Sequence, residues 1–141
     1  MKTAEQRKAS PCYCIRLRRA AGRITDHYSE ALSLTGLTVN QFSLLATLFK
    51  IEGCGTGQLA EAVGLEKSTL VRTLAPVIKA GYIRDDAPEK SRRRQLYLTP
   101  KGKETLAMAT PLWQKAQAGI REKLGKKHQE IMALLDELDT L

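Results

Sequence analysis

The sequence is poor in cysteine, in aromatic residues and in long apolar runs, and two of these scarcities exclude a class of protein. Only 3 of the 141 residues are cysteine, which is too few for a disulfide-stapled secreted domain and suits a reducing compartment. No apolar run approaches the ~20 residues that a membrane-spanning helix needs, and no signal peptide is visible. We therefore expect a soluble protein in the cytoplasm, with no membrane as its partner.

Groups of side chains that hold metals or carry out catalysis are missing as well. Cys12 and Cys14 stand one residue apart and far from His27 and His128, which is not the spacing of a structural zinc site. No paired carboxylates, phosphate-binding glycine loop or Ser/His/Asp set can be assembled. We expect no metal and no other cofactor. A thiol enzyme based on Cys14 is an alternative, although no neighbouring general base is evident.

Acidic residues are outnumbered by basic ones. The chain has 23 Lys and Arg against 15 Asp and Glu, a net charge of +8. The excess lies in two stretches, because residues 1–23 carry seven positive side chains and one negative, and residues 56–103 carry ten and five. A basic balance favours a polyanionic partner but is weak evidence alone. Its coincidence with a binding motif in the second stretch makes nucleic acid the favoured partner.

The second basic stretch has the order helix, turn, helix and hairpin. Residues 58–64 are typical of a short helix that ends in a glycine turn, and Lys67 opens a second helix that ends at Gly81. Strands are predicted at residues 81–84 and 95–99, with a cationic tip between them. This order is typical of a winged helix-turn-helix, whose second helix reads the major groove of DNA and whose hairpin is the wing.

Candidate DNA-binding residues lie at the start of the second helix and at the tip of the wing. The helix offers Lys67, Ser68, Thr69 and Arg72. The wing offers Lys90, Arg92, Arg93 and Arg94. Arg72 is able to donate two bonds to a guanine edge, and the wing arginines suit the minor groove and the phosphates. Alternatively, the polar residues of the helix are only a solvated helix start, and the basic residues of the wing are only a solvated run of charge. A winged helix used only for protein–protein assembly would need no cationic tip.

Helices with apolar stripes are predicted on both sides of this motif. Residues 12–34 carry a stripe formed by Cys14, Leu17, Ala21, Ile24, Tyr28 and Ala31. Thr99-Pro100 is typical of a helix start, Pro111 predicts a kink, and Gly125 separates a last helix. Together these stripes exceed what a small winged helix needs to cover itself. We therefore expect two copies of the chain to pair through them. The alternative is that the stripes pack only within one chain.

The predicted fold is mainly α with a small β-hairpin wing, a winged helix-turn-helix with dimerisation helices at both ends. Residues 1–11 are expected to form a flexible arm, residues 12–35 and 100–141 a helical dimerisation region, and residues 36–99 the winged helix-turn-helix region, all within a single domain. Pro76 lies within the second helix of the motif, where it either bends the start of that helix or is tolerated in packing.

Over residues 12–141 the chain resembles the MarR family of dimeric winged-helix transcriptional regulators. The matching residues are Gly36-Leu37-Thr38-Val39-Asn40-Gln41-Phe42, Leu59-Ala60, Ser68-Thr69-Leu70-Val71-Arg72, Gly81-Tyr82-Ile83 and Leu98-Thr99-Pro100-Lys101-Gly102. The resemblance implies a homodimer joined by the outer helices, a palindromic operator in double-stranded DNA, and usually repression. The family wing usually carries Asp-x-Arg before its second strand. Here Lys90-Ser91-Arg92 lacks the aspartate, and Asp85 or Asp86 is the candidate replacement.

The resemblance also implies control by a small molecule or by oxidation. In the branch that senses organic hydroperoxides, a reactive cysteine lies near the start of the first helix, and Cys14, with Cys12 beside it, is the match. Tyr28 falls where a partner tyrosine of that branch falls, whereas Val39 stands in place of the second tyrosine. Cys14 and Tyr28 are ~21 Å apart along one helix, so they would meet only across a dimer. The alternative is that both cysteines are small apolar fillers.

A small aromatic effector is the other regulatory hypothesis. It would bind between the dimerisation helices and the DNA-binding region, and favour one dimer geometry over another. The candidate lining residues are Leu17, Ala21, Phe42 and Trp113.

Overall fold

The computed structural model describes residues 10–87 and 93–141. Its elements are α2 (Tyr13–Ala31), the 3-10 helix η1 (Ser33–Thr35), α3 (Val39–Lys50), α4 (Thr56–Val63), α5 (Lys67–Lys79), β1 (Ile83–Asp85), β2 (Leu96–Leu98), α6 (Pro100–Leu124) and α7 (Lys127–Leu138). The prediction of a mainly α fold with one small hairpin is therefore confirmed. No helix among the described residues is both long and apolar enough to cross a membrane.

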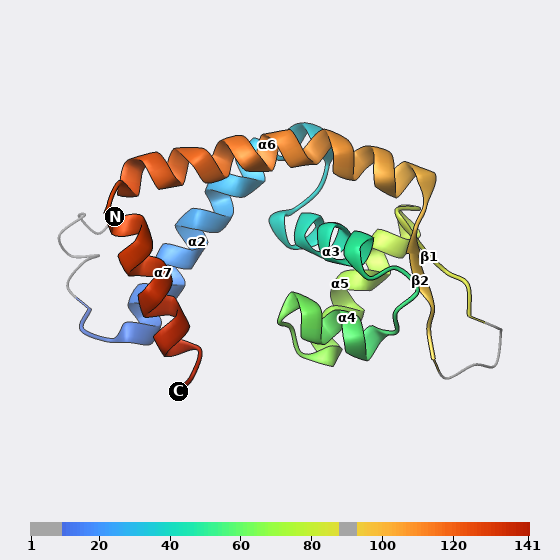
Figure 1. Cartoon of the computed structure of the whole chain (residues 1–141), viewed down its shortest axis with the longest axis horizontal. Coiled ribbons are helices and arrows are strands. Elements are labelled where there is room, and N and C mark those ends of the chain that lie inside the picture. Colours follow the sequence, from blue (N-terminus) through green and yellow to red (C-terminus); the bar gives the residue numbers. More distant parts are fainter. Residues whose placement is uncertain (1–9, 88–92) are drawn as a thin grey trace.

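Figure 1 shows a lobe and an arm joined by the long helix α6. The lobe contains α3, α4, α5 and the β1–β2 hairpin, and it hangs from the first half of α6. The arm contains α2 and α7, which lie toward the other end of α6. This arrangement sets the predicted DNA-binding elements at one end of the protomer and the predicted dimerisation helices at the other.

Local sequence signals set the ends of the helices in the lobe. The Thr38 hydroxyl accepts a hydrogen bond from the backbone N–H of Gln41, and the Gln41 side chain accepts one from the backbone of Thr38, which is a capping box at the start of α3. Gly64, with φ of 82°, makes the turn between α4 and α5, and Gly81, with φ of 85°, follows the end of α5. Only glycine adopts these left-handed angles without strain, so both positions require it.

The two internal prolines do not interrupt their helices. α5 continues through Pro76, and α6 continues through Pro111, each as a single helix. Figure 1 shows α6 as one continuous helix, so the kink predicted at Pro111 does not divide it. Pro76 is exposed, whereas the core-facing side of α5 is formed by Leu70, Leu74 and Val77. The proline therefore lies on the solvent side and is compatible with the packing of α5.

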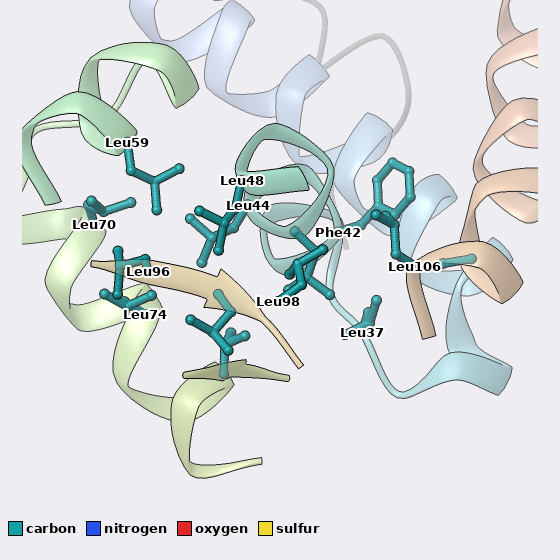
Figure 2. Close-up of a cluster of buried hydrophobic side chains, with 14 of the residues drawn as sticks. Leu37, Phe42, Leu44, Leu48, Leu59, Leu70, Leu74, Leu96, Leu98 and Leu106 are labelled. Carbon is teal, nitrogen blue, oxygen red and sulfur yellow. The ribbon is translucent and has the colours of Figure 1, made fainter. Parts of the chain in front are cut away.

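Leucines dominate the hydrophobic core, which fills the lobe between α3, α5 and the hairpin (Figure 2). The fully buried side chains include Leu44, Leu45, Leu48, Leu59, Leu70, Leu74, Leu96 and Leu98. Leu106 and Ala109 extend the same cluster onto α6. Burial of this much apolar surface is what fixes the positions of the short strands, which could not be stable alone.

The hairpin is paired on both sides of β2. β1 and β2 are antiparallel, with Ile83 opposite Leu98 and Asp85 opposite Leu96. On its other edge, the Leu96 carbonyl accepts a hydrogen bond of 2.7 Å from the Gly53 N–H, and the Leu96 N–H donates one of 3.0 Å to the Cys54 carbonyl. No local sequence pattern predicts this third segment. Cys54 is buried there, and burial raises the pKa of its thiol.

The start of α6 touches the backbone of the lobe directly. The Thr99 hydroxyl accepts a hydrogen bond from the Gly102 N–H and donates one of 2.5 Å to the Gly81 carbonyl. A Cβ atom on Gly102 would lie 2.1 Å from the carbonyl oxygen of Tyr82. The Lys101 ammonium donates to the Ala80 carbonyl at 2.8 Å. The lobe and the first turn of α6 are therefore held together closely enough to move as one unit.

Candidate nucleic-acid interface

Helix α5 presents a polar start to solvent and an apolar face to the core. Its buried residues recur at helical spacing, so the opposite face of the same helix must be exposed. Lys67, Ser68 and Arg72 are exposed, and Thr69 is half-buried. The Thr69 hydroxyl accepts a hydrogen bond of 3.4 Å from the Arg72 guanidinium. This contact holds the guanidinium at the first turns of the helix, beside Lys67 and Ser68.

The wing lacks the aspartate that the family usually carries, but another carboxylate braces its base. One oxygen of Asp85 accepts hydrogen bonds of 3.0 Å from the backbone N–H groups of Ala87 and Gln95. Its other oxygen lies 3.8 Å from Nε of Arg94. Asp86 instead pairs with Arg84 at 3.0 Å. Asp85 is therefore the carboxylate that links the two sides of the hairpin next to the arginines.

The structure brings part of the predicted wing together with the start of α5. A hollow of about 480 Å³ is lined by Lys67 from α5, by Arg93 and Arg94 from the wing, and by residues 55–58 at the start of α4. Lys90 and Arg92, the other predicted wing residues, lie outside the described residues. The positive side chains and the free N–H groups of a helix start both attract anions. This hollow is suited to a phosphate group.

A second, more apolar cavity lies between α3, α6 and the end of α2. Its volume is about 740 Å³, and its walls include Tyr28, Phe42, Leu106 and Trp113. The Phe42 and Trp113 rings stack with their centres 5.6 Å apart, and the Tyr28 and Trp113 rings with theirs 6.4 Å apart. Burial raises the pKa of the Tyr28 hydroxyl, which donates a hydrogen bond to the Gln117 side chain.

Two of the four residues predicted to line an effector site therefore meet in this cavity. Phe42 and Trp113 stack on each other in its wall, whereas Leu17 and Ala21 lie earlier on α2 and are not among its lining residues. Two lysines that sequence analysis missed, Lys50 and Lys103, also line the cavity. No local pattern signals them, because they come from helices that meet only in the folded chain.

The predicted redox residues lie at opposite ends of α2. Cys12 is the residue before the first turn, Cys14 is in that turn, and both are exposed. Tyr28 lies in the last turn of the same helix and packs against Trp113. Within one protomer Cys14 and Tyr28 are therefore far apart.

Comparison with known proteins identifies the family. A model of the MarR family matches residues 37–94. The transcriptional regulator HosA of Escherichia coli O157:H7 is 31% identical over 104 residues, which cover 72% of this chain and 76% of HosA. The chain belongs to the MarR family. It is accordingly a transcriptional regulator and not an enzyme, and the thiol-enzyme alternative for Cys14 is set aside.

Solved structures of two regulators share the fold of this MarR-family chain. The regulator MOSR of M. tuberculosis, in complex with DNA, is 32% identical, covers 92% of this chain and 97% of its own, and superposes with a TM-score of 0.78. The repressor CouR, bound to a 23-mer DNA duplex, is 27% identical, covers 99% and 96%, and has a TM-score of 0.74. DNA binding is thus a property of similar proteins.

Proposed function

We propose that this MarR-family chain is a homodimeric repressor that binds a palindromic operator in double-stranded DNA. The observation that carries the proposal is the cationic hollow, in which Lys67 of α5 and Arg93 and Arg94 of the wing converge. A reading helix with a basic wing beside it suits a major groove and the neighbouring phosphates. The solved complexes of MOSR with DNA and of CouR with a DNA duplex support DNA as the partner.

The contacts divide into base recognition and phosphate binding. Arg72, oriented by Thr69, is the candidate for a guanine edge. Ser68 contacts either a base or a phosphate. Lys67, Arg93 and Arg94 are placed for phosphates around the hollow, and these charge contacts supply most of the affinity. For Lys90 and Arg92, the contacts of the wing with DNA remain predictions from the sequence.

Arg72→Ala tests the recognition role of the reading helix. We expect it to weaken binding to the operator by roughly 1–3 kcal/mol and to relax the choice of base at one position, because a bidentate contact to guanine is lost. Fluorescence anisotropy on a set of duplexes with single base changes measures both effects. Lys79→Ala is the matched control, since Lys79 is exposed at the far end of α5. An equal loss on every duplex would instead make Arg72 a phosphate contact.

The homodimer is supported by apolar surface that one chain leaves uncovered. Every residue from 129 to 141 is exposed. In α7, Leu134 is 57% exposed and Leu138 is 41% exposed, and in α2, Leu17 and Ile24 are 43% and 42% exposed. Amphipathic helices with bare apolar stripes mark a contact surface for another protein. A second copy of the chain is the partner that covers both.

Control by an aromatic effector is proposed for the cavity between α3 and α6. Its walls are mostly aromatic and aliphatic, and Lys50 suits an effector that also carries an acidic group, whereas Lys103 already lies 3.8 Å from a Glu52 carboxylate oxygen. Because the first turn of α6 is joined to the lobe through Gly102, a ligand that favours one spacing of α3 and α6 would also favour one spacing of the two reading helices. Trp113 is the only tryptophan, so its fluorescence reports binding of aromatic acids directly.

Thiol oxidation is a second candidate for control, favoured by the exposure of Cys14 at the start of α2. Oxidation to sulfenic acid would alter this end of the arm. We expect Cys14→Ser to abolish release of operator DNA by an organic hydroperoxide, as measured by gel shift. Release should persist in Cys54→Ala, because the Cys54 thiol is buried. Release from the Cys14→Ser protein would show that another group is the sensor.

A further inference from the structure

The exposed face of the hairpin carries a cross-strand pair, Arg84 and Tyr97, that takes no part in the proposed DNA contacts. In the antiparallel register Arg84 of β1 lies directly opposite Tyr97 of β2, which places both side chains on one face. The Arg84 guanidinium lies over the Tyr97 ring, with Cζ 5.0 Å from the ring centre. A guanidinium in this position is attracted to the face of the ring, so the pair stiffens the base of the wing.

Internal contacts hold the Arg84 guanidinium over this ring. Its Nε donates to both carboxylate oxygens of Asp86 at 3.0 Å, and its Nη1 donates to the Leu98 carbonyl at 3.3 Å. A charge-assisted hydrogen bond and a bond to the strand backbone fix a side chain that otherwise samples many rotamers. Arg84 is therefore placed to position Tyr97, with its donors directed inward and not toward a phosphate.

The hydroxyl end of Tyr97 reaches the turn between α3 and α4. A Cβ atom on Gly53 would lie 3.0 Å from Oη and 3.4 Å from Cζ of Tyr97, so the ring uses space that a side chain would fill. The Gly53 N–H donates to the carbonyl of Leu96, the neighbour of Tyr97 in β2. A Cβ atom on Gly55 would lie 3.5 Å from the Arg94 carbonyl oxygen. The turn is therefore the surface on which β2 and the residue leading into it rest.

This surface is also one wall of the cationic hollow. Gly53 and Gly55 both line it, together with Lys67 of α5 and Arg94 of the wing. Because Arg94 precedes β2 by one residue, a shift of Tyr97 on the turn would change the separation of Arg94 from Lys67. That separation decides which phosphates the two cations bind together, and phosphate contacts fix the register of a protein on its duplex.

We propose that Arg84 and Tyr97 are positioning residues for DNA binding, which hold the wing on Gly53 so that Arg94 stays at a fixed separation from Lys67. The proposal rests on the DNA-binding function proposed above, and it adds two residues that act through others. Tyr97 is the spacer between the wing and the turn, and Arg84 is the clamp that keeps the ring in place. Loss of the spacing would remove a phosphate contact from each protomer without touching the base contacts of α5.

The test places a methyl group against Tyr97 and then makes room for it. Gly53→Ala brings a Cβ to the Tyr97 hydroxyl, and Gly53→Ala/Tyr97→Phe removes that hydroxyl. Gly36→Ala is the matched control, because Gly36 has a φ of 74° against 88° for Gly53, but no atom within 4 Å of an added Cβ. Both alanines thus strain a left-handed backbone, and only one meets the wing. Arg84→Lys keeps the charge and loses the planar group that covers the ring.

Each full-length variant is titrated with two labelled duplexes, one from upstream of the protein's own gene and one with the same bases scrambled. Anisotropy is recorded over a series of KCl concentrations, sedimentation velocity reports the oligomeric state, and urea denaturation reports the stability. A loss of stability alone lowers the fraction of active protein by the same factor at each salt concentration. The slope of log K against log[KCl] therefore separates a positioning role from a purely structural one.

We expect Gly53→Ala to weaken binding to both duplexes by the same factor, about tenfold, and to lower the slope by about 2, because each protomer loses one phosphate contact worth ~0.9. Gly53→Ala/Tyr97→Phe should regain the wild-type slope. Gly36→Ala should keep that slope, although its stability also falls. Arg84→Lys should lower the slope by about 1–2 with its charge retained.

A wild-type slope in Gly53→Ala or in Arg84→Lys would overturn the proposal, as would an equal fall in Gly36→Ala or no recovery when Tyr97→Phe is added. If Gly53→Ala does not fold, Arg84→Lys decides the question, because Arg84 is exposed and its replacement leaves the core intact. Failure of the wild-type protein to prefer its own upstream duplex would instead count against the proposed function.

Discussion

Gly102→Ala is expected to lower the free energy of unfolding by about 3 kcal/mol or more. The added Cβ, whose position the backbone of α6 fixes, would lie 2.1 Å from the backbone carbonyl oxygen of Tyr82. Neither side can rotate away, so the first turn of α6 must separate from the lobe. Urea denaturation followed by circular dichroism measures the loss.

Gly22→Ala is the matched control for this substitution. Gly22 lies inside α2 with no atom close to the position of an added Cβ. Alanine is the better helix former, so this variant should be unchanged or more stable by about 0.5–1 kcal/mol. A Gly102→Ala protein as stable as the wild type would mean that the junction between α6 and the lobe is looser than described. The proposed coupling of the cavity to the reading helix would then lose its mechanical basis.

Leu135→Asp/Leu138→Asp is expected to separate the dimer and to reduce operator affinity by roughly 10²–10⁴-fold. Two carboxylates on the apolar stripe of α7 would have to be buried in the contact between protomers, which costs more than the contact gains. Each released protomer keeps its reading helix but loses the second, linked half-site contact. Sedimentation velocity and anisotropy on the operator duplex measure the two effects.

Leu34→Asp provides the comparison, because Leu34 is a leucine that is 87% exposed on η1, outside both stripes. It should leave the dimer and the operator affinity unchanged. If the α7 variant stays dimeric, the arms do not form the contact. If it dissociates and still binds the operator with full affinity, the reading helices do not act as a linked pair.

The sequence predicts those parts of the fold that depend on local chemistry. The cap at Thr38, the left-handed glycines at Gly64 and Gly81, and the Thr99-Pro100 helix start each satisfy a backbone requirement within a few residues. These signals, in their order along the chain, were sufficient to predict the winged helix-turn-helix. The residues of this chain that match the MarR family lie on the elements of this winged helix-turn-helix.

The parts that the sequence does not predict depend on contacts between distant segments. The pairing of Gly53 and Cys54 with Leu96 joins a turn to a strand with two helices between them. The cavity depends on Trp113 stacking on Phe42, which no periodic pattern encodes. For the same reason, Leu17 and Ala21, which were expected to line an effector site as apolar residues, lie away from this cavity.

The choice between Asp85 and Asp86 illustrates the limit of sequence reasoning over a short distance. The two aspartates are adjacent in the sequence and carry the same charge, so residue type alone does not show which of them braces the wing. Only the pairing of β1 with β2 turns Asp85 toward Gln95 and Arg94, while Asp86 meets Arg84. The brace of the wing is thus set by strand register.

The stoichiometry of the complex with DNA tests the central claim most directly. Native mass spectrometry of the full-length protein with a duplex from upstream of its own gene should show two protomers on one duplex. A scrambled duplex should be displaced at lower salt, because it offers phosphate contacts without the matching bases. A single protomer per duplex, or equal binding of both duplexes at every salt concentration, would contradict the account.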